Sequence, residues 1–159
     1  MMRSRLWHTA KSFYVKATKS KIKMGAKANL VNEPQTVLSG NDTVVIRQYN
    51  GGITGGVTLD MTGFDGPVKA GHLVIRTLDE DGVNYTYKPM PVSGESYGAL
   101  PAEHEYAGVV VASKPNDYPL VGVMDDGRVN DVAMPYQFAD STQRAAVKAA
   151  LPNLIFEHD

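Results

Sequence analysis

The chain of 159 residues contains no cysteine, and this absence excludes several classes of function at once. Without thiols there are no disulfides, no thiolate metal ligands and no cysteine nucleophile, although the redox compartment stays undetermined. No apolar run approaches the ~20 residues that a membrane-spanning helix needs. No apolar core of a signal peptide follows the first basic residues either. We therefore expect no membrane partner.

Motifs that indicate catalysis are also lacking. In Glu103-His104-Glu105 the neighbouring side chains diverge, and no two of the four histidines share a metal-ligand spacing. The acidic runs at 79–82 and 125–127 end in glycine, which is typical of turns rather than of two carboxylates facing one cleft. The glycines of 51–56 lack the Lys-Ser/Thr of a phosphate loop, and His72 is expected to be a turn residue with a satisfied ring nitrogen. We predict a protein that is not an enzyme, with no catalytic residue, cofactor or metal.

What the sequence does contain is an uneven distribution of charge. Residues 1–27 carry eight basic residues and no acidic one, whereas the remaining chain carries 8 basic and 17 acidic residues. The net of +8 in the first part and −9 in the second gives the overall −1. This division predicts a basic N-terminal arm, residues 1–28, that is disordered alone and ordered on a partner. Alternatively, Met24 is the natural start and residues 1–23 are an upstream extension.

Residues 29–159 have the pattern of one β-rich, mainly β (α+β) domain. Runs of β-branched or alternating residues between turn residues predict strands at 43–47, 73–76, 83–87, 106–112, 120–124 and 128–130. The second and third of these form a hairpin, the fourth is buried on both faces, and 125–127 is a turn. Residues 51–57 are expected to be a loop or a bulged edge. A helix over 142–151, capped by Asp140 or Ser141 and stopped by Pro152, precedes a short strand at 154–156.

From about Ala70 to Phe156 the order of these elements resembles the lambdoid capsid decoration (head-stabilising) proteins and the related phage head-fibre proteins. The resemblance lies in the order of a turn and strand, a strand opening on glycine, a strand ending at a glycine, a polar strand before proline, and an alanine-rich helix followed by an apolar strand. These segments are Ala70-Gly71-His72-Leu73-Val74-Ile75, Gly108-Val109-Val110-Val111-Ala112, Val121 to Gly127, Arg128 to Pro135, Ser141 to Ala150, and Leu154-Ile155-Phe156.

The resemblance implies a compact, small β-barrel or sandwich-like domain that sits as a trimer on local three-fold positions of a phage head and stabilises it. The implied partners are the major capsid protein and further copies of the chain in a homotrimer. The implied location is the capsid surface of the virion, after assembly in the host cytoplasm. Residues 29–66 match less clearly, and the basic arm departs from the short polar N-terminus that is usual in this family.

The candidate capsid-binding residues are the bases of the arm and the apolar residues that follow it. If residues 29–38 add a strand to a capsid edge, main-chain hydrogen bonds would supply affinity. The candidates are Arg3, Arg5, Lys11, Lys16, Lys19, Lys21, Lys23, Lys27, Leu30, Val31, Val37 and Leu38.

Two other functions remain open. One is a surface glycan-binding β-module that presents Tyr85, Tyr87, Tyr97, Tyr106 and Tyr118 to sugars. The other is nucleic-acid binding through the arm, whose eight bases could neutralise phosphates. An acidic body repels a polyanion, so the charge division favours an acidic capsid face over nucleic acid. We expect no small-molecule substrate.

Overall fold

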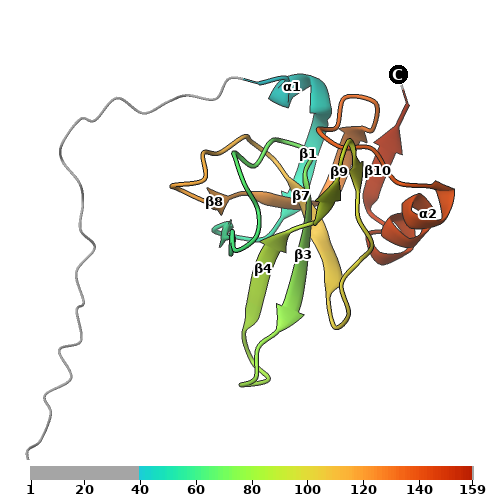
Figure 1. Ribbon diagram of the computed structural model, residues 1–159. Coiled ribbons are helices and arrows are strands. Elements are labelled where there is room, and N and C mark those ends of the chain that lie inside the picture. The colour runs from blue at the N-terminus through green and yellow to red at the C-terminus, as the bar shows by residue number, and fades with distance from the viewer. Residues whose placement is uncertain (1–39, 159) are drawn as a thin grey trace, which may run out of the picture. The chain divides into compact units, whose positions relative to one another are not determined.

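Ten strands and two helices follow one another along residues 40–158, which are the residues that the computed structural model describes (Figure 1). In chain order they are α1 (Asp42–Val45), β1 (Ile46–Gly52), β2 (Val57–Thr58), β3 (Leu73–Leu78), β4 (Tyr85–Pro89), β5 (Val92–Ser93), β6 (Ser96–Tyr97), β7 (Glu105–Val110), β8 (Leu120–Val121), β9 (Val123–Asn130), α2 (Ser141–Ala150) and β10 (Leu154–Glu157).

The main sheet has six strands in the order β1-β9-β7-β3-β4, with β10 also paired to β9. Only the β9–β10 pair of this sheet is parallel. The two smaller sheets are β2–β8 and β5–β6. A mainly β fold with a short helix near the C-terminus is confirmed. The sheets are open, so the expectation of a barrel is wrong.

The predicted turn at 125–127 is wrong, because β9 runs through it without interruption. Gly127 faces Tyr49 of β1 and Leu154 of β10, so strands flank it on both sides. A Cβ at Gly127 would lie 2.2 Å from the carbonyl oxygen of Gln48, and its φ is 154°. The glycine therefore allows strands to approach closely, and it does not turn the chain.

The predicted strand at 43–47 begins late, because its first residues form the single helical turn α1. The amides of Val44 and Val45 both donate to the carbonyl of Asn41, at 2.9 Å. The strand starts at Ile46 and extends to Gly52. Its register with β9 is irregular at Gly51 on both sides, which confirms a bulged edge in this region.

Local signals predicted the remaining elements well. The hairpin is confirmed, since β3 and β4 pair from Val74–Pro89 to Leu78–Tyr85. Asp140 caps α2 by accepting the Gln143 amide at 2.7 Å, and α2 ends just before Leu151 and Pro152. The last strand, β10, is also confirmed. The short β5–β6 pair was not predicted.

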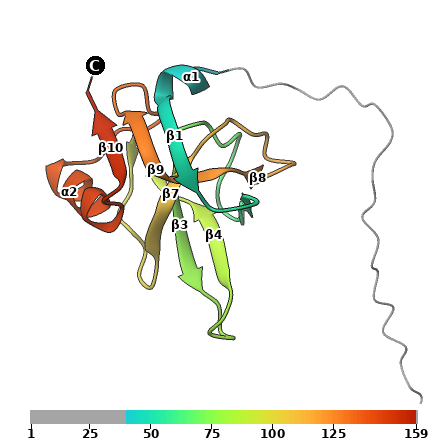
Figure 2. The ribbon, with the colours of Figure 1, turned by 180° about the vertical axis from the view of Figure 1, so that it is seen from behind.

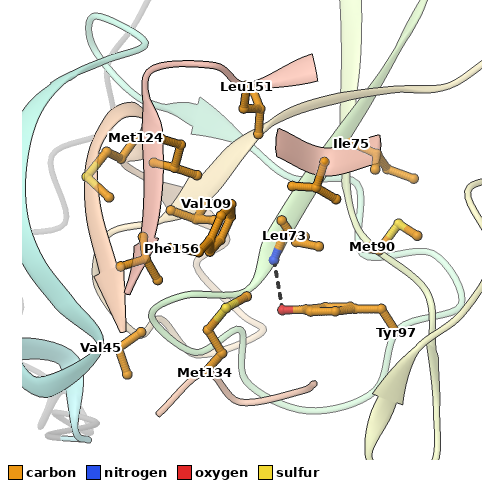
Figure 3. Packing of buried hydrophobic residues seen from close by; sticks show 13 residues of the cluster. Val45, Leu73, Ile75, Met90, Tyr97, Val109, Met124, Met134, Leu151 and Phe156 are labelled. Atoms are coloured by element: carbon orange, nitrogen blue, oxygen red, sulfur yellow. Dashed lines mark hydrogen bonds between the residues drawn. The ribbon is translucent and has the colours of Figure 1, made fainter. Parts of the chain in front are cut away.

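Two apolar clusters form the core, one on each face of the central strands. Leu73, Ile75 and Val109 belong to the first cluster, whereas the alternating neighbours Val74 and Val110 belong to the second. This alternation buries β3 and β7 on both faces, as predicted for β7. Figure 3 shows the first cluster around the Tyr97 hydroxyl, which accepts the Leu73 amide at 3.1 Å.

We predict that Gly127→Ala destabilises the domain by more than ~3 kcal/mol, because the new Cβ must displace the backbone of β1. Gly63→Ala is the matched control, since Gly63 also has a positive φ (80°) but no atom within 4 Å of the place that an added Cβ would occupy. The control should cost only about 1–2 kcal/mol. Urea unfolding measures both free energies, and equal losses would contradict the close strand approach.

Candidate functional site

A depression in the surface lies where the described chain begins. It has a volume of about 420 Å³. The lining comes from α1 and the two residues before it, the segment before β3, Ser113, and the loop after β9. We call it the entry groove and define it by Asp42, Val45, Lys69, Ala70, Ser113 and Met134.

Hydrogen bonds from Ser113 to Asp42 hold α1 at one wall of the entry groove. The carboxylate accepts the backbone amide of Ser113 at 2.8 Å and its hydroxyl at 2.7 Å. The same hydroxyl oxygen accepts the amide of Ala70 at 3.0 Å. Three segments far apart in the sequence are thus fixed to one another by one serine residue.

Gly71 allows α1 to pack against the start of β3. A Cβ at this position would lie 2.3 Å from Cγ1 of Val45, and the φ of Gly71 is 81°, which glycine tolerates best. Val45 and Met134 are 3% and 5% exposed. With the buried Ala70 they give the entry groove an apolar floor.

The entry groove also carries basic charge. Lys69 is exposed and lines it. Lys114 is close by, because residues 68 and 114 exchange two backbone hydrogen bonds of 3.0 and 2.8 Å. Neither lysine has an acidic partner within residues 40–158. An anionic group could therefore bind here without breaking an ion pair.

His72 closes a turn that begins at Lys69, whose carbonyl accepts the His72 amide at 3.1 Å, so the expected turn residue is confirmed, but its side chain is buried in the core. The rings of Phe64, Tyr97 and Tyr136 meet it edge-on, with centroid distances of 5.1, 5.4 and 5.4 Å. Nε2 is 3.0 Å from the carbonyl oxygen of Met90, so one ring nitrogen is satisfied as expected. Nδ1 is buried and has no partner among the described atoms. Burial lowers the pKa of His72 from 6.5 to about 4.

The five tyrosines of the glycan hypothesis do not share one surface. Tyr97 is 1% exposed and belongs to the core. The guanidinium of Arg76 lies 4.4 Å from the ring centroid of Tyr85 and covers one face of that ring. Tyr87 and Tyr106 are half-buried, and Tyr118 is 65% exposed. Tyr85 and Tyr87 are the only two of the five whose rings are paired, with centroids 6.5 Å apart, so the five do not form one stacking platform for sugars.

Residues that sequence reasoning singled out for possible chemistry stay apart. His104 contacts the carbonyl of Ala102 through Nδ1 at 2.8 Å, and Glu105 pairs with Arg76 at 2.7 Å. Within residues 40–158, no three His, Asp or Glu side chains are placed to hold a metal ion. No helix in this part of the chain has the length and apolarity to cross a membrane.

One ionic cluster was missed from the sequence. Asp131, whose side chain is 7% exposed, pairs with Arg144 of α2 and with His158, the latter at 3.1 Å. Its backbone amide also donates to the carbonyl of Glu157 at 2.9 Å. The cluster ties the loop after β9 to α2 and to the end of β10. No sequence motif signals it, because the residues are separated along the chain.

The twelve predicted capsid-binding residues, from Arg3 to Leu38, all lie outside the described residues. The boundary predicted between residues 28 and 29 lies outside them too. These remain predictions.

No family model matches the chain, and neither the curated proteins nor the solved structures that were searched contain a match.

Since the unfolded pKa of His72 lies above the folded value, the neutral ring stabilises the fold fully above pH 6.5 and this stability is lost as the pH falls toward 4. We predict that His72 alone makes the free energy of unfolding about 2 kcal/mol lower at pH 5 than at pH 7. His72→Phe should remove that part of the pH dependence. Urea unfolding of both proteins at both pH values measures it, and the same pH dependence in both would contradict the assignment.

Proposed function

We propose that the chain is a structural, non-catalytic protein of a phage head that binds the outer surface of the capsid as a trimer and stabilises it. The observation that carries the proposal is the location of basic charge. Residues 40–158 hold eight basic and fifteen acidic residues, a net of −7. Yet Lys69, which lines the entry groove together with Gly40, lacks an acidic partner in this region, and residues 29–39 connect Gly40 in the sequence to the basic arm.

This arrangement directs one end of an acidic domain toward an acidic surface. The arm contributes eight bases, and Lys69 of the entry groove adds one more. An outer capsid face with negative charge would attract this end and repel the rest of the domain. The acidic domain would likewise be repelled by nucleic acid, which disfavours that alternative.

Exposed apolar side chains beside the entry groove support docking at this end. Val44 and Val132 are both 46% exposed, and each is next in sequence to a residue that lines the groove. Contact with a shell would remove them from water, at a gain of about 25 cal/mol per Å² of apolar area. Three such domains in one trimer would bind with higher avidity than one.

The proposed orientation points the β3–β4 hairpin away from the shell. In Figures 1 and 2 this hairpin extends from the body on the side opposite α1. Its turn is held by Asp81, whose carboxylate accepts the amides of Val83 and Asn84 at 2.8 and 2.9 Å. The exposed Leu78 and Val83 near its tip are then free of the capsid contact.

We predict that the full-length protein co-sediments with empty shells of the phage whose genome encodes it, saturating at a multiple of three copies. A chain that starts at Met24 lacks seven of the eight bases of the arm and should lose most of this binding. Because exposed charges are screened by salt, binding should also weaken as ionic strength rises. A monomer that binds no shell in either form would overturn the proposal.

A further inference from the structure

We propose that the entry groove is a second docking site, which binds a short acidic segment that also carries an apolar side chain, presented by the capsid protein. This inference rests on the proposed function, because it names the chemistry of the shell element that the domain contacts beside the arm. The capsid-binding residues predicted from the sequence all lie within residues 1–38. The entry groove would add a capsid-binding site within residues 40–158.

The floor of the entry groove fits an apolar side chain. Val45, Ala70 and Met134 are almost fully buried, yet each contributes to the lining. A volume of about 420 Å³ lies toward the lower end of the range for ligand pockets, so it suits a short extended segment. Val44 and Val132, which are exposed and next in sequence to lining residues, would extend the apolar contact.

The wall of the entry groove fits a carboxylate. Lys69 lines it, and Asp42, the acid in the lining, is already engaged by two hydrogen bonds from Ser113. Lys69 and Asp42 do not form an ion pair. The ammonium is thus available to a partner's acid, and the apolar floor beside it would strengthen that contact by excluding water.

Most other cations of the described domain are committed to acids of the same chain. Arg76 pairs with Glu105, Lys88 with Asp60, Arg128 with Glu157, and Arg144 with Asp131. Lys148 lies in the last turn of α2, where the helix dipole favours a positive charge. Lys69 is distinct, because it lines a groove with an apolar floor.

The position of the entry groove indicates that its partner is the same surface that the arm binds. Gly40 and Asn41 line it, and residues 29–39 connect them in the sequence to the predicted arm. A surface acidic enough to hold eight bases also offers carboxylates to Lys69. Two linked contacts on one surface gain affinity through a high effective concentration.

The test uses the full-length, ¹⁵N-labelled protein and the peptide acetyl-Leu-Asp-Glu-Val-amide, with acetyl-Leu-Lys-Lys-Val-amide as the charge-reversed probe. We expect the acidic peptide to shift the backbone amide signals of Asn41, Ala70 and Ser113, with a dissociation constant of ~1 mM. Lys69→Glu should weaken binding about tenfold, whereas Lys148→Glu, an exposed lysine on α2, should leave it within about twofold. Dispersed amide spectra of both variants verify that they fold.

Three results would overturn the inference: no shift of these amides at about 10 mM acidic peptide, equal shifts with the basic peptide, or equal affinity of the Lys69→Glu and Lys148→Glu proteins. A groove already filled by residues 35–39 of the same chain would give the first of these. Sedimentation with shells separates the inference from the proposed function. If wild type binds shells and Lys69→Glu binds equally well, the groove assignment fails alone. If wild type binds no shell, the proposed function fails and the peptide result decides the groove.

Discussion

The pairing of β9 with three strands is the constraint on which the rest of the domain depends. β1 occupies one edge of β9, and β7 and then β10 occupy the other. The backbones approach so closely that three glycines are required, and a Cβ at the first of them, Gly52, would lie 2.1 Å from the carbonyl oxygen of Val123. A Cβ at Gly127 would meet the carbonyl oxygen of Gln48 at 2.2 Å, and one at Gly108 would meet that of Met124 at 2.4 Å. The β3–β4 hairpin joins the sheet through β7. Along the sequence, α2 connects β9 to β10, the strand that pairs with β9.

The same register creates the entry groove. Because Ile46 pairs with Val129, the residues just before β1 and those just after β9 lie at the same end of the sheet. The first are α1, and the second lead to Met134, so both reach the groove. Ser113 then closes the third side through its bonds to Asp42, 71 residues earlier. Strand pairing in the interior therefore determines where the entry groove lies.

Local signals could be predicted from the sequence, and contacts between distant residues could not. The hairpin and the capped helix depend on neighbouring residues, so both were found. Asp125-Asp126-Gly127 has a turn composition, but pairing of β9 on both edges outweighs that preference. The turn at His72 was predicted correctly, but nothing in the neighbouring sequence reveals the three rings that surround its side chain. The entry groove joins four separate segments and has no linear motif, while the arm residues lie outside the described region.

The proposed function connects these features through charge and orientation. A domain with a net charge of −7 over residues 40–158 would be held on an acidic shell by its one basic end, with the β3–β4 hairpin directed outward. Electron cryo-microscopy of empty shells saturated with the protein tests this most directly. We predict density for three copies around each local three-fold axis, with α1 and the entry groove against the shell. Density with the hairpin against the shell, or with copies not grouped in threes, would contradict it.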